Sequence, residues 1–536
     1  MSKKEKFTEI ITSGYTFKGD SIVLGAAMLD GETINGLQVK VPLRTLNRHG
    51  LIAGATGSGK TKTLQIIAEQ LSSKGVPVLL MDIKGDLSGI AAPGAANPKI
   101  EERHLKIGEP FVPGTSPVEF LSLSEEKGAR LRATVTEFGP VLFSKILDLN
   151  DTQGGVVAVV FKYCDDNKLP LVNLADFKKV LQYITGPGKE EIEGDYGQVS
   201  SATVGIIMRK IIELEHQGAE AFFGERSFDP GDLCRFDENG KGIVSVIRLT
   251  DIQDRPKLFS TFMLQLLAEI YSTFPEEGDL DQPKLCIVIE EAHLVFAEAS
   301  KALLNQIEAI VRLIRSKGVG VFFVTQSPAD IPENVLAQLG LKVQHSLRAF
   351  TAKDRKSIKL AAENYPLTDY YDVAQLITEL GIGEAFITAL NEKGIPTPLA
   401  HVLLRAPQSR MDVLTDSEID SIIRRSQIAR KYNEVIDSHS AQEILTQKMD
   451  QIAREQEEEE YRKQREKEMA ELERSRAKTT SRTTSSRTTT SRPRAQQSTF
   501  EKIVNSPTTR QIGRTIAGEL TRGLLGVLGI KTGRRR

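Results

Sequence analysis

The sequence has few cysteines and no long apolar segment. Its three cysteines, Cys164, Cys234 and Cys286, lie far apart and match neither a disulfide framework nor the spacing of a metal site. Basic residues open the sequence, but no apolar stretch of a signal peptide follows them. No apolar run approaches the roughly 20 residues that a membrane-spanning helix needs. We therefore expect a cytoplasmic protein with reduced thiols and without a membrane span.

The sequence also lacks an excess of charge of either sign. Its net charge is -1, so the charge of the whole chain does not indicate a polyanionic partner. No helix-turn-helix or zinc-finger pattern is found. The hydrophobic share of 40% and the charged share of 26% are typical of a globular domain. Because 536 residues are too many for one compact core, we expect a large domain with accessory segments.

Apolar, strand-like runs alternate with amphipathic helical patterns over residues 48–405. This alternation predicts an α/β domain with a mostly parallel sheet covered by helices. Helical patterns dominate between about residues 120 and 235 and predict a helical insertion. Short alternating runs in residues 1–47 predict a short N-terminal β segment.

The C-terminal part has a different composition. Residues 406–478 predict helices, the last of them almost entirely charged. Residues 479–499 form a basic low-complexity stretch that predicts a disordered linker. From Lys478 onward there are thirteen Lys or Arg residues against two Glu, so this tail is locally positive. Residues 500–536 form a short C-terminal segment. Its residues 510–530 are interpreted as a subunit contact, with a membrane-surface helix as the alternative.

The strongest motif is a phosphate-binding loop. Residues 54–61, GATGSGKT, match G-x-x-x-x-G-K-[ST] in full, between an apolar run and a helical pattern. The glycines let backbone N–H groups point at phosphate oxygens, and the helix N-terminus adds positive charge. We expect Lys60 to reach the β- and γ-phosphates of ATP and the Thr61 hydroxyl to ligate Mg²⁺. The predicted nucleotide-binding residues are Gly54, Ala55, Thr56, Gly57, Ser58, Gly59, Lys60, Thr61 and Lys62.

A later apolar run ends in two carboxylates, Glu290 and Glu291. Carboxylates at the end of a buried strand are costly to bury without a cation. We expect Glu290 to contact Mg²⁺ through water and Glu291 to polarise the attacking water. Aspartate is usual where Glu290 stands, so the division of roles between the two glutamates stays open.

Three further polar residues are candidates for catalysis. Gln326 follows a buried strand and would sense the γ-phosphate or position water, or else cap the strand. Arg312 and Arg315 lie three residues apart, on one face of a helix. An arginine offered to the γ-phosphate site of a neighbouring subunit is an arginine finger, whereas a solvated surface arginine is the alternative.

Together these motifs resemble the HerA–FtsK division of P-loop ATPases, and specifically the bacterial HerA-like family named for a helicase HerA-like C-terminal domain. The match runs over most of residues 5–410 and includes LNRHGLIAGATGSGKTKTLQ, MDIKGDLSGI, IEEAHLVF and GIGEAFI. Two features depart from the family pattern. Glu290 replaces the usual aspartate, and the region before the P-loop is shorter than in archaeal members, whose motor follows a β-barrel.

The resemblance implies a RecA-like core in which the acidic strand lies between the P-loop strand and its neighbour. It also implies a ring-shaped hexamer that moves DNA. The short region before the P-loop leaves open whether a nuclease or another protein is a partner. Gln326 falls on the polar strand-end residue of the family, and Arg315 falls on its trans-acting arginine. Asp82, Lys84 and Asp86 fall on a D-x-K-G-D element.

The sequence therefore predicts an ATP-hydrolysing motor, an oligomeric DNA translocase or helicase-like ATPase. Two alternatives stay open. One is an ATPase that remodels or anchors a protein partner without depending on DNA. The other is a nucleotide-binding switch with slow turnover.

Overall fold

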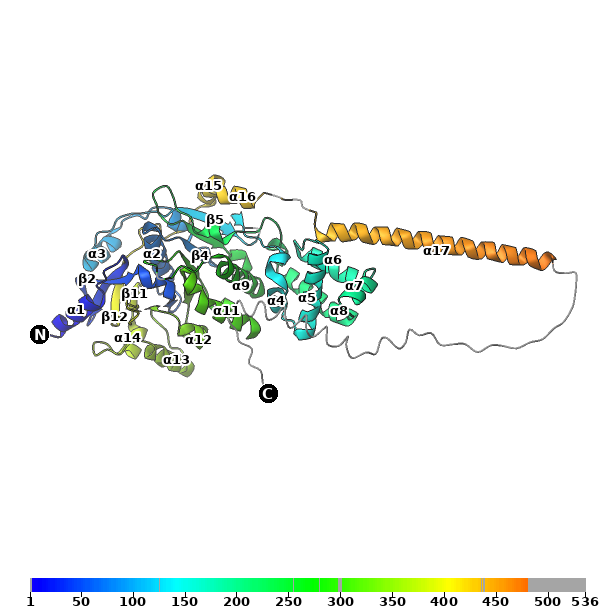
Figure 1. Cartoon of the computed structure of the whole chain (residues 1–536). Helices are drawn as coiled ribbons and strands as arrows, with labels where there is room; N and C mark the ends of the chain where they lie inside the picture. The colour runs from blue at the N-terminus through cyan, green and yellow to red at the C-terminus, as the bar shows by residue number, and fades with distance from the viewer. Residues whose placement is uncertain are drawn as a thin grey trace. The chain divides into compact units, whose positions relative to one another are not determined.

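The chain folds into two compact units (Figure 1). The computed structural model describes residues 2–480 apart from 125, 254, 279, 297–300, 435, 437 and 438. The first unit comprises residues up to 134 together with 212–436, and the second comprises 135–211 together with the residues after 436. The predicted linker is described only at its first two residues, which end a helix, and the segment 500–536 lies outside the described residues.

The first unit contains a sheet of twelve described strands. In spatial order they are β2 (Glu32–Pro42), β1 (Ser21–Leu29), β12 (Ala400–Leu404), β11 (Glu384–Thr388), β10 (Leu341–Gln344), β3 (Gly50–Ala53), β9 (Val319–Thr325), β8 (Leu285–Ile289), β4 (Val78–Asp82), β7 (Val244–Arg248), β5 (Val118–Ser122) and β6 (Ala129–Arg130). All neighbours from β10 to β6 are parallel, whereas β11, β12, β1 and β2 continue the sheet in antiparallel pairs.

The central strands are buried on both faces. Every residue of β4, β8 and β9 is buried, a pattern that requires cover above and below the sheet. Leu80, Val288 and Phe322 point to one face and share a core cluster with residues of α2 (Lys60–Ser73). Phe323 points to the other face, where its ring lies 5.5 Å from that of Phe296. Helices therefore sandwich the strands that lead to the P-loop.

This topology confirms the predicted α/β class with a mostly parallel sheet. The acidic strand β8 does lie between the P-loop strand β3 and the next strand along the chain, β4, but β9 lies there too. Before the P-loop, the predicted β segment consists of the hairpin of β1 and β2, preceded by a helix that the sequence did not indicate, α1 (Lys3–Gly14).

Among the described residues, ten further α-helices lie wholly within the first unit. They are α2, α3 (Pro98–Ile107), α9 (Pro256–Thr273), α10 (His293–Phe296), α11 (Lys301–Ile314), α12 (Glu333–Leu336), α13 (Ala352–Glu363), α14 (Val373–Glu379), α15 (Asp416–Arg425) and α16 (Gln427–Tyr432).

The second unit is helical in its described part. Its helices are α4 (Val135–Ile146), α5 (Asp151–Asp166), α6 (Leu174–Thr185), α7 (Lys189–Asp195), most of α8 (Ser201–His216) and α17 (Ala441–Thr480). Phe143, Phe161 and Phe177 form an aromatic core, with ring centroids 4.8–6.1 Å apart. The start of α17 is attached to this core, because the Gln442 N–H donates to the buried Asp176 carboxylate at 2.8 Å.

Beyond its first turns, α17 is exposed. Almost every described side chain from residue 449 to 474 faces solvent, as expected for a helix built from Glu, Lys and Arg. None of the described helices combines the length and apolar character that crossing a membrane requires.

The domain limits drawn from the sequence remain a prediction. Helices α4 to α8 fall inside the predicted insertion (120–235), but residues 118–122 and 129–130 pair in the sheet as β5 and β6.

We predict that Gly320→Ala destabilises the first unit. A Cβ at Gly320 in β9 would collide with the backbone carbonyl oxygen of Leu46, which cannot move without shifting the chain. We expect the free energy of unfolding to fall by about 1–3 kcal/mol, as for other overpacked sites. Urea denaturation would measure this.

Gly155→Ala is the matched control, because nothing lies within 4 Å of a Cβ built at Gly155 in helix α5. This change should be neutral or stabilising by up to about 1 kcal/mol. Equal destabilisation by the two substitutions would contradict the close approach described at β9.

Candidate functional site

Four parallel strands end at the same edge of the sheet and place the candidate residues there. The register pairs Ala53 of β3 with Thr325 of β9, and Ile289 of β8 with Met81 of β4. The residues that follow these strands therefore meet at one edge, where ligands of open α/β sheets bind. The P-loop follows β3, Gln326 follows β9, and Glu290 follows β8.

The P-loop has the geometry of an anion cradle. Gly57 and Gly59 adopt φ values of 79° and 112°, which L-residues with side chains rarely adopt. Helix α2 begins at Lys60, immediately after Gly59. The Lys60 ammonium lies across the loop, donating to the carbonyl oxygens of Gly54 at 2.7 Å and Ala55 at 3.1 Å. Backbone N–H groups, a helix N-terminus and an ammonium group thus converge where phosphate groups would bind.

An acidic cluster lies beside the first turn of α2. The Thr61 hydroxyl is 3.4 Å from Oε1 of Glu290, so the two predicted metal ligands are brought together. Glu290 is only 2% exposed. One oxygen each of Asp82, Asp86 and Glu290 lies within 4.8 Å of the others.

Two oxygens of this cluster, Oε2 of Glu290 and Oδ1 of Asp86, are buried and have no hydrogen-bond partner among the described residues. Unpartnered buried carboxylate oxygens are costly, and oxygen ligands of this kind suit a hard divalent cation. The residues present therefore fit Mg²⁺.

Burial and mutual repulsion raise the pKa values of two acids in this cluster, Glu290 and Asp82. Burial, together with the charges of Asp86 and Asp82, raises the pKa of Glu290 to about 8. Burial raises the pKa of Asp82 to about 6, although Asp82 accepts hydrogen bonds from the backbone N–H groups of residues 85–87. Without a cation, the ionised form of Glu290 is therefore unfavourable near neutral pH.

Glu291 lies in a different environment. Burial alone would raise the pKa of Glu291, but an ion pair with Lys84 outweighs it, and the pKa is lowered. The second carboxylate oxygen lies 3.2 Å from Nδ1 of His293 and accepts a hydrogen bond from Nε2 of Gln326 at 3.5 Å. The backbone of Glu291 has a φ of 46°. Glu291 is thus an ionised carboxylate at the end of β8, held by three side chains.

Two lysines approach this edge from different strands. Burial, followed by the nearby charge of Lys84, lowers the pKa of Lys60. Lys84, in the turn after β4, therefore brings a second ammonium group to the region of Lys60 and Glu291. The resemblance placed Lys84 in the D-x-K-G-D element, but its ion pair with Glu291 was not predicted.

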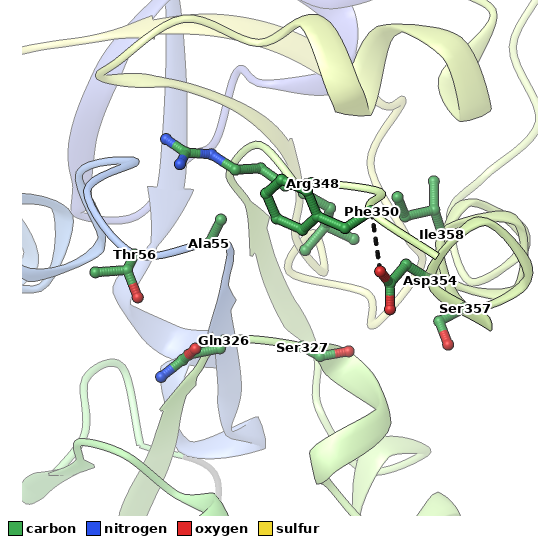
Figure 2. A pocket seen from close by; sticks show the side chains of 10 residues that line it. Ala55, Thr56, Gln326, Ser327, Arg348, Phe350, Asp354, Ser357 and Ile358 are labelled. Carbon is green, nitrogen blue, oxygen red and sulfur yellow. Dashed lines mark hydrogen bonds between the residues drawn. The ribbon is translucent and has the colours of Figure 1, made fainter. Parts of the chain in front are cut away.

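A polar pocket opens beside the P-loop on the side of Gln326 (Figure 2). Its volume is about 350 Å³. It is lined by Ala55 and Thr56 of the P-loop, Gln326 and Ser327 after β9, and Arg348 and Phe350 after β10. Asp354, Ser357 and Ile358 of α13 close its far side, with Asp354 accepting the Phe350 N–H at 3.0 Å.

Arg312 and Arg315 lie away from this site. Both side chains are exposed, and Arg315 precedes β9, whereas Gln326 follows it. The seven residues of β9 span roughly 20 Å at about 3.3 Å per residue. Neither arginine can therefore reach the P-loop of its own chain, and a role on phosphate requires a second copy.

The structure thus brings Lys60, Thr61, Glu290, Glu291 and Gln326 to one edge and leaves both arginines at the other. Lys62, the last predicted nucleotide-binding residue, donates to the carbonyl oxygen of Met411 at 2.5 Å. No role was predicted for Asp82 or Asp86. Their membership of the D-x-K-G-D element, which carries two carboxylates, was the signal in the sequence that could have indicated one.

The comparison with known families decides the classification. The family described as helicase HerA-like C-terminal matches residues 28–536. The chain belongs to this family. The resemblance predicted from the motifs is thereby confirmed.

Curated relatives are distant and longer. The HerA-like chain is 25% identical over 374 residues to the DNA double-strand break repair helicase HerA of Sulfolobus acidocaldarius, covering 68% of this chain and 66% of that protein. It is 24% identical over 361 residues to the protein of the same name from Saccharolobus solfataricus, covering 66% and 63%. The chain thus spans just under two thirds of the length of these two relatives.

Among solved structures, the bacterial conjugative coupling protein TrwB in its unbound monoclinic form aligns with 76% of the HerA-like chain and 94% of its own. The TM-score is 0.49 at 14% identity.

We predict that the buried acid cluster makes stability depend on pH. The pKa of Glu290 rises from its usual 4.5 to about 8 in the folded chain, so the folded state binds more protons than the unfolded state between these values. Stability should therefore fall as pH rises from about 5 to about 8 in EDTA. The effect is on the order of a few kcal/mol, and Glu290→Gln should remove most of it.

Melting temperatures across this pH range would measure the effect. Added Mg²⁺ should restore the stability of the unsubstituted chain near pH 8, because a cation bound to the folded state stabilises it. Parallel pH profiles for the two proteins in EDTA would show that Glu290 is not the titrating group.

Proposed function

We propose that this chain is an ATP-hydrolysing, oligomeric motor of the HerA type that acts on DNA. The observation that carries the proposal is the shared sheet edge. There the P-loop, the Thr61–Glu290 pair and the ionised Glu291 meet. This arrangement offers a phosphate cradle, a divalent cation site and a carboxylate for water in one place.

The proposed roles follow from the contacts. The backbone of residues 54–62 and the Lys60 ammonium bind the phosphates of ATP. Thr61 and Glu290 hold Mg²⁺, with Asp82 and Asp86 close to the same position. When bound, Mg²⁺ supplies positive charge against the phosphate oxygens.

Glu291 orients the attacking water and accepts its proton. Oε1 of Glu291 pairs with Lys84, and Oε2 contacts His293 and Gln326. Because a carboxylate oxygen can accept more than one hydrogen bond, Oε1 can also accept one from the water. In this proposal Gln326 holds that water or contacts the γ-phosphate, and its hydrogen bond to the same carboxylate supports the role.

Oligomerisation follows from the position of the arginines. Arg315, supported by Arg312, completes the γ-phosphate site of a neighbouring copy. A head-to-tail contact of this kind closes into a ring, and we propose a homohexamer.

DNA is the proposed load, because the curated relatives are named as DNA repair helicases. The basic residues after Lys478 also favour a polyanion. A cytoplasmic location and a nuclease or other protein partner belong to the same proposal.

The first test is ATP hydrolysis with and without DNA. We expect double-stranded DNA to stimulate hydrolysis and the stimulation to fall steeply as salt increases. Lys60→Ala should lose nearly all activity, because the substitution removes the ammonium group of the cradle. Near-normal ATP turnover by Lys60→Ala would mean that the P-loop is not the site of hydrolysis. Hydrolysis by a monomer that ignores DNA would instead favour the ATPase that remodels a protein partner.

The second test mixes two inactive variants. Arg315→Ala keeps its own site but offers no arginine, whereas Glu291→Gln offers the arginine but has no working site. Each alone should lose roughly 10³-fold or more in kcat, as for other arginine fingers and catalytic carboxylates. In an equal mixture, about one quarter of the head-to-tail interfaces should regain a complete site. Mixtures as inactive as the separate variants would show that Arg315 does not act in trans, and the same experiment with Arg312→Ala tests the other arginine.

A further inference from the structure

A buried histidine joins the strand that leads to the P-loop to the helix that leads to Arg315. His49 directly precedes β3 and is 2% exposed. Its Nδ1 accepts a hydrogen bond from the N–H of Val321 in β9 at 3.0 Å. Its Nε2 lies 2.8 Å from the carbonyl oxygen of Val311, in the last turn of α11. Both ring nitrogens therefore contact backbone groups of other elements.

These two contacts determine which ring nitrogen of His49 carries the proton. A nitrogen that accepts from an N–H has no hydrogen, so Nε2 is protonated and donates to Val311. Burial lowers the pKa of His49 to about 4, and the charge of Arg315 adds to the lowering, whereas the hydrogen bond to Val311 opposes it. The imidazole is therefore neutral near pH 7 and presents one donor and one acceptor in fixed directions.

The backbone of His49 adopts a conformation that favours glycine. Its φ is 61° and its ψ is 172°, a combination that residues with a side chain rarely adopt. Glycine would relieve this strain, and an apolar side chain would avoid the cost of burying a polar ring. Neither the backbone nor burial favours a histidine here, so what the residue supplies is its pair of hydrogen bonds.

His49 lies at the edge of the sheet opposite the P-loop. The four residues of β3 separate it from the first P-loop residue, Gly54. Arg315 follows α11 directly, four residues after Val311, so the carbonyl group that His49 contacts belongs to the helical turn next to Arg315. The hydrogen bond from His49 therefore constrains the arginine end of α11 and leaves the phosphate cradle untouched.

The segment that carries Arg315 is also held from another side. The N–H of Glu277, which follows α9, donates to the carbonyl oxygen of Ser316 at 2.9 Å. His49 adds a contact from the sheet. The backbone on both sides of Arg315 is thus fixed by groups that belong to different elements.

We propose that His49 is a positioning residue for the arginine that one subunit offers to its neighbour. By tying the last turn of α11 to β9 and to the start of β3, His49 sets the position from which the Arg315 side chain projects. The proposal rests on the proposed function, because it assumes that Arg315 acts in trans. The position matters, because a misplacement of about 1 Å at a reacting group lowers a rate roughly 10²-fold.

Two substitutions separate the hydrogen bonds of His49. The amide nitrogen of Gln lies near the position of Nε2, so His49→Gln keeps the donor for Val311 and loses the acceptor for Val321. The amide oxygen of Asn lies near the position of Nδ1, so His49→Asn keeps the acceptor and loses the donor. We expect His49→Asn to lower kcat for ATP hydrolysis roughly 10²-fold with KM unchanged, and His49→Gln to stay within about threefold of the unsubstituted chain.

Mixed subunits locate the defect. His49→Asn has a working site of its own and misplaces only the arginine, so an equal mixture with Glu291→Gln should recover activity, as expected for Arg315→Ala. A mixture of His49→Asn with Arg315→Ala should stay inactive, because neither variant offers a well-placed arginine. In a single chain, adding His49→Asn to Arg315→Ala should lower kcat no further, because His49 acts through the arginine.

Recovery of His49→Asn with Arg315→Ala, and none with Glu291→Gln, would overturn the proposal, because the defect would then lie in the P-loop of the substituted chain. A normal kcat for His49→Asn, or equal losses for His49→Asn and His49→Gln, would overturn it too. If Arg315→Ala itself does not recover with Glu291→Gln, the trans arginine of the proposed function is wrong, and the role of His49 is wrong with it.

His49→Gly covers the case in which His49→Asn does not fold. Glycine suits the backbone at this position and supplies neither hydrogen bond. His49→Gly should therefore fold and show the same loss of kcat and the same recovery with Glu291→Gln. A folded His49→Gly with normal kcat would contradict the positioning role.

His104→Asn is the matched control. His104 is also 2% exposed, and its ring contacts the carbonyl oxygen of Glu109 at 2.9 Å and the N–H of Ala406 at 3.2 Å. Neither partner belongs to β3, β9 or α11. His104→Asn should keep a normal kcat, and a loss as large as that of His49→Asn would show that removing any buried imidazole is enough.

Discussion

The balance of charge at the carboxyl edge of the sheet governs the site. Asp82, Asp86, Glu290 and Glu291 end or follow two adjacent strands, β4 and β8. The described residues bring three ammonium groups close to them, those of Lys60, Lys62 and Lys84. The four carboxylates outnumber these ammonium groups, so this edge carries an excess of negative charge when all of them are ionised. A divalent cation would neutralise this excess, and the raised pKa of Glu290 is the response of the chain when no cation is present. Cation binding and ionisation of the acids are therefore coupled events.

Much of this edge could be predicted because its residues follow buried strands directly. The limits of β3 and β4 agree with the apolar runs in the sequence, and the P-loop motif lies where the pattern places it. Glu290 and Thr61 could be predicted as ligands of the same Mg²⁺, because Glu290 follows an apolar run and Thr61 belongs to the P-loop motif. Such signals are local, because a buried strand and the polar residue that follows it are neighbours in the chain and therefore stay together in the fold.

The contacts that could not be predicted depend on the order of the strands in the sheet, which no local stretch of sequence encodes. Lys84 meets Glu291 only because β4 lies beside β8, and this pairing joins residues about two hundred positions apart. Arg312 and Arg315 illustrate the opposite case. Their sequence spacing indicated a shared helix face, but only the length of β9 shows that they cannot serve their own chain.

Helix α17 has a mechanical consequence. Its start is attached to the helical unit at Gln442, whereas almost every described side chain from residue 449 to 474 is exposed to solvent. Forty residues at 1.5 Å per residue make a rod of roughly 60 Å. A rotation of about 10° at the base of such a rod displaces its tip by roughly 10 Å. A small tilt at the start of α17 is thus amplified along the helix into a large displacement of its described end at residue 480.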